Sequence, residues 1–338
     1  MNTETLKSVA DTTVANGRGI LAMDESLGTI TKRFTALGIE VTEENRRVYR
    51  SLLAGCPGLG EFVSGAILFD ETIRQSSPEG VPIPELLKAN NIAPGIKVDK
   101  KTHDLANFPG EKITEGLDGL RDRLAEYREL GAVFAKWRAV YAIGDGIPSP
   151  AGYHANAHAL ARYAALCQEQ GLVPIVEPEV LMNGDHDLAR CFEVTSAAQK
   201  ELFSELAAHD VYLEGTLLKP NMVIAGQDCP TPAHVEEVAE ATVRCLTESV
   251  PSEVAGVVFL SGGQSAQLAT QHLNAMNQEG GHPWPLSFSY GRALQNEAMS
   301  AWSGKAGNAE EAKRRLLHRA RCCSAACKGD YSDEMEKA

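Results

Sequence analysis

The sequence lacks the long apolar runs that membrane-spanning helices need. Nowhere in its 338 residues do about 18 apolar residues follow one another. The first 19 residues are polar with mixed charge and lack the apolar core of a signal peptide. We therefore expect a protein that does not enter a membrane and is not exported by the general secretory route.

Positive charge is also in short supply. The chain has 32 Lys and Arg against 45 Asp and Glu, a formal net charge of −13. A negative field of this size repels nucleic acid and anionic lipid, so we expect neither as a partner. An anionic small ligand would need a pocket in which the few cations are concentrated.

Disulfide frameworks, zinc motifs and nucleotide-binding loops are missing as well. The eight cysteines form neither a dense framework nor a paired CxxC pattern, which favours reduced thiols in a cytosol-like compartment. We expect a cytoplasmic protein, with the plastid stroma as the alternative for a mature form that has lost a transit peptide. No GxGxxG follows the first apolar run, and no GxxxxGK(S/T) is present.

Eight short apolar runs recur along the chain, and most end in charged or hydroxyl residues. They begin about 30 to 45 residues apart, which leaves room for a strand, a helix and two connections in each unit. Their positions are 19–24, 63–70, 93–99, 133–140, 173–179, 215–220, 256–262 and 285–291. We interpret them as eight parallel strands.

Helical patterns lie between these runs, most clearly at 117–130, 155–170, 234–250 and 308–327. The alternation predicts an α/β fold of the (β/α)8 TIM-barrel type, as one domain spanning residues 1–338. We expect an N-terminal helix at about 1–18 and a disordered polar tail at about 330–338. A doubly wound sheet is the alternative, since buried parallel strands look alike in both folds, but the missing phosphate loops count against it.

Charged side chains stand at the predicted carboxyl ends of the strands, which converge on one mouth in a barrel. Any one of these charges could simply extend into solvent, but so many in apolar strands are costly and together indicate a function. Residues i and i+2 point to the same side of a strand, so Lys136 shares a side with Arg138, and Glu177 with Glu179. The charged residues are Asp24, Lys97, Asp99, Lys136, Arg138, Glu177, Glu179, Lys219 and Arg292, and the seventh strand ends in the hydroxyl of Ser261.

Lys219 is the candidate nucleophile. It follows two leucines and precedes a proline in Thr-Leu-Leu-Lys-Pro-Asn. A desolvated amine near another cation, here Lys136, loses its proton more readily and can attack a carbonyl carbon to form a Schiff base. The alternative is a lysine that only forms an ion pair with Glu177.

Two groups of residues are suited to binding phosphate. Barrels commonly bind phosphate after strands seven and eight, where small residues expose backbone N–H groups to the anion. The small residues here are Ser261, Gly262, Gly263, Ser289 and Gly291, and Arg292 adds a guanidinium. Lys32 and Arg33, after the first strand, form a weaker second group, because exposed Lys-Arg pairs are usually only solvated.

Seven motifs of the chain, in order, resemble those of the class I (Schiff-base) fructose-1,6-bisphosphate aldolases. They are 19–26 (GILAMDES), 95–100 (GIKVDK), 134–138 (FAKWR), 173–179 (VPIVEPE), 214–222 (EGTLLKPNM), 259–265 (FLSGGQS) and 288–295 (FSYGRALQ). The resemblance implies reversible cleavage of fructose 1,6-bisphosphate to dihydroxyacetone phosphate and glyceraldehyde 3-phosphate, in glycolysis and gluconeogenesis. It suggests a homotetramer, and we expect neither a cofactor nor a catalytic metal ion.

The resemblance also implies roles for individual residues. Lys219 would form the Schiff base, Glu177 would shuttle protons during carbinolamine dehydration, and Asp24 would take the proton of the C4 hydroxyl. Lys136 and Glu179 would tune these groups. The phosphate of the dihydroxyacetone half would meet Ser261, Gly262, Gly291 and Arg292, and the other end of the substrate would lie nearer Ser26, Lys32, Arg33, Lys97 and Arg138.

The chain departs from the family in three places. Thr29 stands where a serine is common and keeps the hydroxyl, so it remains in the binding set. Lys101 replaces a frequent glycine, which leaves the conformation of the loop through Gly110 open. The chain stops at residues 336–338, whereas many relatives end in a tyrosine that assists proton exchange.

Other functions remain as alternatives. A metal-dependent aldolase would need a ligand set, but no third ligand stands out beside His154 and His158, and His318 with Cys322 fits a packed or solvated helix face better. Another Schiff-base lyase, of the transaldolase type, would keep Lys219 without needing two phosphate sites. A scaffold or binding role would be an addition to catalysis. The preference between fructose 1,6-bisphosphate and fructose 1-phosphate stays open.

Overall fold

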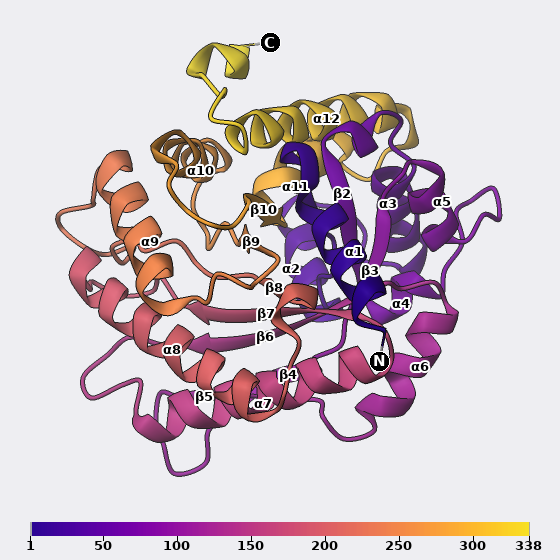
Figure 1. Ribbon diagram of the computed structural model, residues 1–338. Helices are drawn as coiled ribbons and strands as arrows, with labels where there is room; N and C mark the ends of the chain where they lie inside the picture. The colour runs from indigo at the N-terminus through magenta and orange to yellow at the C-terminus, as the bar shows by residue number, and fades with distance from the viewer. Residues whose placement is uncertain (1, 338) are drawn as a thin grey trace.

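Eight parallel strands close into a barrel in the computed structural model, which describes residues 2–337 (Figure 1). Around the barrel the strand order is β1-β10-β9-β8-β7-β6-β3-β2. The strands are β1 (Gly19–Ala22), β2 (Val63–Leu68), β3 (Ala93–Lys97), β6 (Phe134–Tyr141), β7 (Val173–Val180), β8 (Leu217–Leu218), β9 (Gly256–Phe259) and β10 (Leu286–Tyr290). Each coincides with one of the eight apolar runs to within a few residues, which confirms the predicted (β/α)8 barrel.

Helix α1 (Thr3–Val14) closes the N-terminal end of the barrel. Its buried residues Leu6, Ala10 and Val14 recur every four positions and form one stripe, which packs on strand side chains inside the barrel. Gly256 at the start of β9 permits this close approach, because a Cβ atom there would lie 2.9 Å from Val14. The carboxyl ends of the strands, on the opposite side, therefore form the mouth.

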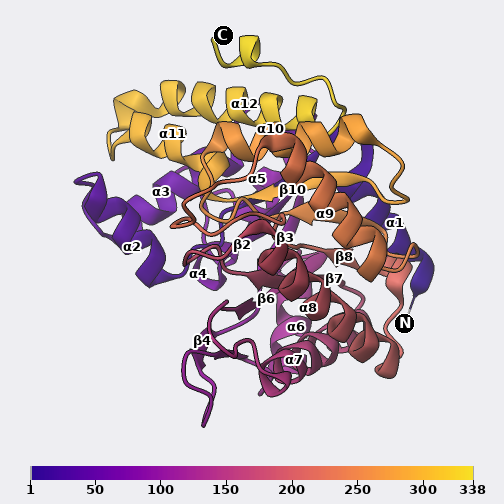
Figure 2. The same cartoon turned by 90° about the vertical axis from the view of Figure 1, so that its left-hand side faces the viewer.

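The other helices surround the barrel as an outer layer (Figures 1 and 2). Within residues 2–337 they are α2 (Leu27–Ala36), α3 (Glu43–Ala54), α4 (Asp70–Ile73), α5 (Ile83–Ala89), α6 (Leu120–Glu129), α7 (Pro150–Glu169), α8 (Leu188–Ala208), α9 (Val235–Ser249), α10 (Ala266–Glu279), α11 (Arg292–Trp302) and α12 (Ala309–Ala326). Helices α6, α7, α9 and α12 match the four predicted helical segments. No helix in the described part of the chain is both long and apolar enough to cross a membrane.

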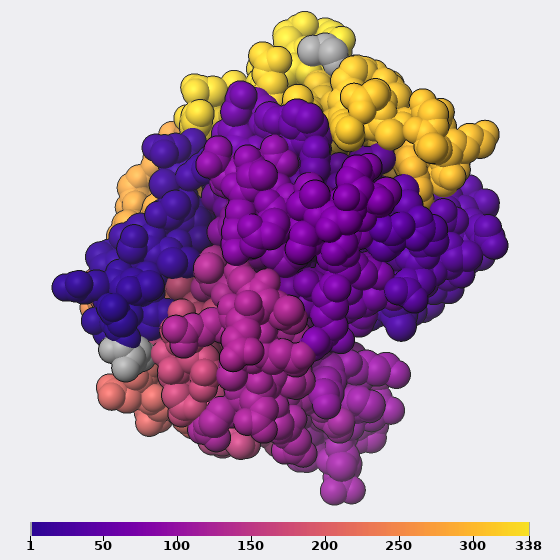
Figure 3. All heavy atoms as spheres, turned by 90° about the vertical axis from the view of Figure 1, so that its right-hand side faces the viewer, coloured from indigo at the N-terminus to yellow at the C-terminus, as the bar shows by residue number. Residues whose placement is uncertain are grey.

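A hairpin beyond β3 was not predicted. Strands β4 (Lys101–Asp104) and β5 (Lys112–Glu115) pair antiparallel, and the turn between them places Asn107 and Gly110 at positive φ. The hairpin stands out from the body of the molecule (Figures 2 and 3). Its strands are mostly exposed and polar, so they contain no apolar run from which they could be predicted.

The C-terminal segment is held against the body of the molecule, so the expectation of a disordered tail is wrong. Glu336 Oε1 accepts hydrogen bonds from Arg319 Nη1 at 2.6 Å and from Tyr331 Oη at 2.7 Å. Arg319 on α12 is only 1% exposed, so this carboxylate balances a buried charge. Met1 and Ala338, the ends of the predicted helix and tail, lie outside the described residues.

Candidate active site

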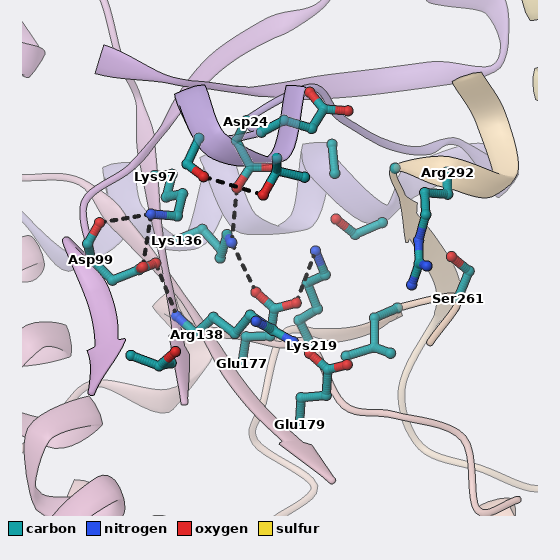
Figure 4. Close-up of a pocket in the computed structure, with 18 of the residues that line it drawn as sticks. Asp24, Lys97, Asp99, Lys136, Arg138, Glu177, Glu179, Lys219, Ser261 and Arg292 are labelled. Atoms are coloured by element: carbon teal, nitrogen blue, oxygen red, sulfur yellow. Dashed lines mark hydrogen bonds and ion pairs between the residues drawn. The ribbon is translucent and has the colours of Figure 1, made fainter. Parts of the chain in front are cut away.

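A cavity of about 450 Å³ lies at the carboxyl ends of the barrel strands (Figure 4). Eight cationic and five acidic side chains line it, so the negative charge of the whole chain does not extend to this place. The charged lining residues are Asp24, Glu25, Arg33, Lys97, Asp99, Lys100, Lys101, Lys136, Arg138, Glu177, Glu179, Lys219 and Arg292. Such a cavity suits an anionic ligand.

Four buried or half-buried charges meet at its floor. Lys136 Nζ lies 2.9 Å from Asp24 Oδ2 and 3.0 Å from Glu177 Oε2. The other oxygen of Glu177 lies 3.2 Å from Lys219 Nζ. Asp24, Lys136, Glu177 and Lys219 thus form a row of alternating negative and positive charges (Figure 4).

The strands position these four side chains from four different parts of the sequence. Asp24 follows β1, while Lys136 and Glu177 lie on the neighbouring strands β6 and β7. Lys219 follows the short strand β8, and its backbone N–H donates to the carbonyl oxygen of Val176 at 2.8 Å. Closure of the barrel brings all four to one mouth, as the strand-end pattern predicted.

Each charge in this row is maintained by its neighbours. Burial would raise the pKa of Asp24 and Glu177, but the charges of Lys136 and Lys219 outweigh it. The pKa of Asp24 falls to about 2, and that of Glu177 is also lowered. Burial would lower the pKa of Lys136, but Asp24 and Glu177 raise it well above its usual range. At neutral pH both carboxylates are therefore ionised and Lys136 is protonated.

Two further ion pairs flank the row. Lys97 Nζ lies 2.8 Å from Asp99 Oδ1, and Arg138 Nε contacts Glu179 Oε2. Asp99 also accepts a hydrogen bond from the backbone N–H of Arg138 at 3.3 Å, which links the two pairs. These cations face the cavity with their charges already partly balanced.

Arg33 and its neighbours form contacts that the sequence did not indicate. The Arg33 guanidinium contacts the Glu25 carboxylate, and its Nη2 donates to Asn296 Oδ1 at 3.1 Å. Gln295 Nε2 donates to the same Glu25 carboxylate at 2.9 Å. Arg33 lines the cavity, whereas Lys32, predicted with it, is exposed and does not.

The predicted phosphate residues at the ends of β9 and β10 do gather. Ser261, Gly262, Ser289 and Gly291 line the cavity together with Arg292. The Ser289 hydroxyl is buried and has no hydrogen-bond partner within residues 2–337, so it is available to a ligand. The Arg292 guanidinium points toward the cavity and forms no ion pair within the same residues (Figure 4).

The remaining predicted residues lie at the edges of the site. Ser26 and Thr29 line the cavity, with their hydroxyls 3.2 Å apart at the start of α2. Gly263 does not line it; its φ of +89° favours glycine, and a Cβ atom there would lie only 3.0 Å from Met182 Sδ. Sequence reasoning missed Lys100 and Thr102 as lining residues and left the place of Lys101 open, because their hairpin could not be foreseen.

Known proteins similar to this chain are fructose-bisphosphate aldolases. Residues 5–338 match the family described as "Fructose-bisphosphate aldolase class-I", under the heading "Glycolytic". A "Probable fructose-bisphosphate aldolase class 1" of Xanthomonas campestris is 58% identical over 95% of this chain and 96% of its own length. "Fructose-bisphosphate aldolase 1" of Toxoplasma gondii is 54% identical over 94% of this chain and 88% of its own.

A solved structure is similar to this chain as well. It is that of fructose-bisphosphate aldolase from Plasmodium falciparum in complex with TRAP and a small-molecule inhibitor. It matches with a TM-score of 0.96 and 48% sequence identity, over 98% of this chain and 96% of that one. The family match spans nearly the whole chain, and the chain therefore belongs to the class-I fructose-bisphosphate aldolase family.

Proposed function

We propose that Lys219 is the nucleophile with which this glycolytic aldolase forms its Schiff base, and that Glu177 is its proton carrier. One observation carries the proposal: the Lys219 amine lies buried in the cavity, 3.2 Å from a carboxylate that Lys136 holds from the other side. A base within hydrogen-bond reach of the nucleophile is what covalent catalysis by an amine requires.

The proton path follows from the charges. Glu177 is ionised in the free enzyme, so it can act as an acid only after it has received a proton. The neighbouring Lys219 ammonium is a source: transfer to Glu177 leaves a neutral amine, which attacks the ketose C2 carbonyl. A proton passes from the attacking nitrogen to the former carbonyl oxygen, which gives the neutral carbinolamine. Glu177 then returns its own proton to the carbinolamine hydroxyl, which leaves as water and completes the iminium ion.

Carbon–carbon cleavage requires a second base. Asp24 lies on the far side of Lys136 from Glu177 and is ionised throughout the physiological pH range. In our proposal it accepts the C4 hydroxyl proton while the C3–C4 bond breaks and its electrons pass to the iminium ion. The products are glyceraldehyde 3-phosphate and the enamine of dihydroxyacetone phosphate.

The two ends of the cavity would hold the two phosphates. Arg292, Ser261, Ser289 and the glycines beside them lie at one end, and the free guanidinium supports binding of the phosphate common to fructose 1,6-bisphosphate and fructose 1-phosphate. At the other end we add Lys100 and Lys101 to the expected cations. Neither forms an ion pair within residues 2–337, whereas Lys97, Arg138 and Arg33 do.

Borohydride trapping tests the nucleophile. Reduction in the presence of dihydroxyacetone phosphate should inactivate the enzyme and attach the label to the peptide that contains Lys219. Lys219→Arg keeps the charge and should take up no label. A label on Lys136 or another lysine, or activity that resists borohydride and disappears in EDTA, would overturn the assignment.

Assembly and location are also part of the proposal. We infer a cytoplasmic homotetramer in which each chain is one barrel domain. Support for the location comes from an Arabidopsis thaliana relative described as cytosolic, 50% identical over 95% of this chain. A Chlamydomonas reinhardtii relative described as chloroplastic is 51% identical and supports the alternative location in a plastid. Sedimentation analysis and fractionation would decide the two points separately.

A further inference from the structure

Three histidines and two glutamates gather where α7 packs on α8, in the outer layer and away from the cavity. His154 and His158 lie one turn apart on α7. Glu201 and Glu205 lie one turn apart on α8, and His209 caps that helix one turn later. The sequence offered only the first two residues as a pair, because the other three follow about one βα unit later.

The Glu205 carboxylate lies among three imidazoles. Its Oε2 is 2.9 Å from His158 Nδ1 and 3.6 Å from His209 Nδ1, and its Oε1 is 3.3 Å from His154 Nδ1. Glu201 Oε1 lies 3.1 Å from the same nitrogen of His154. His158, Glu205 and His209 each offer a ligand atom within 4.8 Å of the others, and so do His154, Glu201 and Glu205, so the two groups share one carboxylate.

These separations match those between the ligands of a small metal ion. Zinc binds imidazole nitrogen and carboxylate oxygen at about 2.0–2.2 Å, which places tetrahedral ligand atoms about 3.3–3.5 Å apart. We propose that His158, Glu205 and His209 form a binding site for a divalent transition-metal ion such as Zn²⁺, with His154 beside the same carboxylate. Glu201 stands next to His154 as a further carboxylate.

Charge and access favour an ion here. Neutral imidazoles with two carboxylates carry a net charge of −2, which a divalent cation balances. Glu205 is 14% exposed, whereas His154 is 62% exposed, so the carboxylate is held by the fold and the ion approaches from solvent. His209 Nδ1 also lies 2.9 Å from the backbone oxygen of Glu205, and this hydrogen bond is given up when the nitrogen binds the ion.

The site is separate from the aldolase chemistry. None of its residues lines the cavity at the barrel mouth. The ion would instead join α7 to α8, the helices that follow the strands carrying Lys136 and Glu177. Its expected effect is therefore to raise thermal stability by binding the folded state, with turnover independent of the metal.

A second cluster provides a contrast. His318, Cys322 and Glu336 also have ligand atoms near one another, but Glu336 already balances Arg319 there. This cluster contains a thiol, whereas the one on α7 and α8 contains only nitrogen and oxygen ligands. Cobalt spectroscopy separates them, because a thiolate ligand adds an intense near-ultraviolet charge-transfer band and imidazole and carboxylate ligands do not.

The test uses the full-length enzyme, stripped of metal with a chelator and titrated with Zn²⁺ and with Co²⁺. We expect one ion per chain, a visible Co²⁺ spectrum without a thiolate band, and a thermal midpoint that rises with Zn²⁺. The paired substitution His158→Gln and His209→Gln should weaken binding by at least about tenfold and abolish the thermal shift. His103→Gln and His318→Gln are controls and should bind as the wild type does, since both lie outside the proposed site; His103 pairs with Glu115 on the β4–β5 hairpin.

The proposal fails if the wild type binds neither ion at micromolar concentration, or if the paired variant binds as tightly as the wild type. It also fails if the Co²⁺ spectrum carries a thiolate band that His318→Gln removes. Circular dichroism and the metal-free thermal midpoint show whether the paired variant is folded. If its fold is lost, His158→Gln alone, at a half-exposed position, decides the question by the same titration.

Discussion

Replacing Lys136 with methionine tests whether one buried cation keeps both neighbouring carboxylates, Asp24 and Glu177, ionised. Methionine has a similar length and no charge, so the change removes two ion pairs without opening a large cavity. Lys136 is 3% exposed and lies 2.9 Å from Asp24 and 3.0 Å from Glu177. An opposite charge at this range lowers a carboxyl pKa by about 1–3 units. Its loss should move the pKa of Asp24 from about 2 to about 3–5.

The consequence for stability has a definite sign. A carboxyl whose pKa is lowered by folding stabilises the protein above its unfolded pKa, and this contribution is lost as pH falls through the folded pKa. For Asp24 the change from 3.8 to about 2 corresponds to roughly 2 kcal/mol. Lys136→Met should therefore lower the free energy of unfolding most at neutral pH, and the difference from the wild type should shrink as pH falls below about 4.

The assay combines denaturant unfolding with the pH dependence of kcat/KM. In Lys136→Met we expect kcat to fall by about 10²–10⁴-fold and the acidic limb of the profile to move to higher pH. Lys100→Met is the matched control, because it removes a cation of the same cavity that forms no ion pair within residues 2–337. An acidic limb that stays in place while kcat falls would refute the claim that Lys136 sets the charge of these carboxylates.

Four further changes test other parts of the molecule. Glu177→Gln should lower kcat by about 10²–10⁴-fold with little change in KM, and near wild-type turnover would remove Glu177 from the proton path. Arg292→Ala should reduce kcat/KM for fructose 1,6-bisphosphate and for fructose 1-phosphate by similar factors. Arg33→Ala should reduce kcat/KM for the bisphosphate by no more than about tenfold, because Glu25 already balances the charge of Arg33. Both variants are measured at fixed ionic strength, and equal effects of Arg33→Ala on the two substrates would make its role structural. Deleting residues 332–338 should change turnover by less than about threefold. The deletion removes Glu336, the partner of the buried Arg319, and should therefore lower the denaturation midpoint. An unchanged midpoint would contradict this expectation.

The sequence predicted the barrel because its strands are local signals. A strand buried on both faces is a short run of apolar residues, and the eight runs appear at the spacing of βα units. The hairpin of β4 and β5 has no such signal. Its exposed residues, such as Lys101 and Asp104, could equally belong to an irregular loop.

The site was predictable to the extent that it depends on strand ends. Strand alternation and barrel closure together place Lys136, Glu177 and Lys219 at one mouth. The partners of more distant residues could not be foreseen in this way. Gln295 reaches Glu25 across 270 positions of sequence, and Arg33 reaches Asn296 across 263. Nothing in the spacing of either residue indicates the other.

The alternating charges at the barrel mouth explain how so many ionised groups can be buried together. Each of Lys136 and Glu177 has an opposite charge on both sides, which offsets the cost of removing it from water. In the proposed mechanism, conversion of the Lys219 amine to an iminium ion keeps a positive charge at the end of the row, so the balance would hold while the covalent intermediate exists. A neutral intermediate at that position would leave Glu177 with only Lys136 as a close partner. We therefore expect the row to favour the cationic iminium over the neutral carbinolamine that precedes it, which is the direction that cleavage requires.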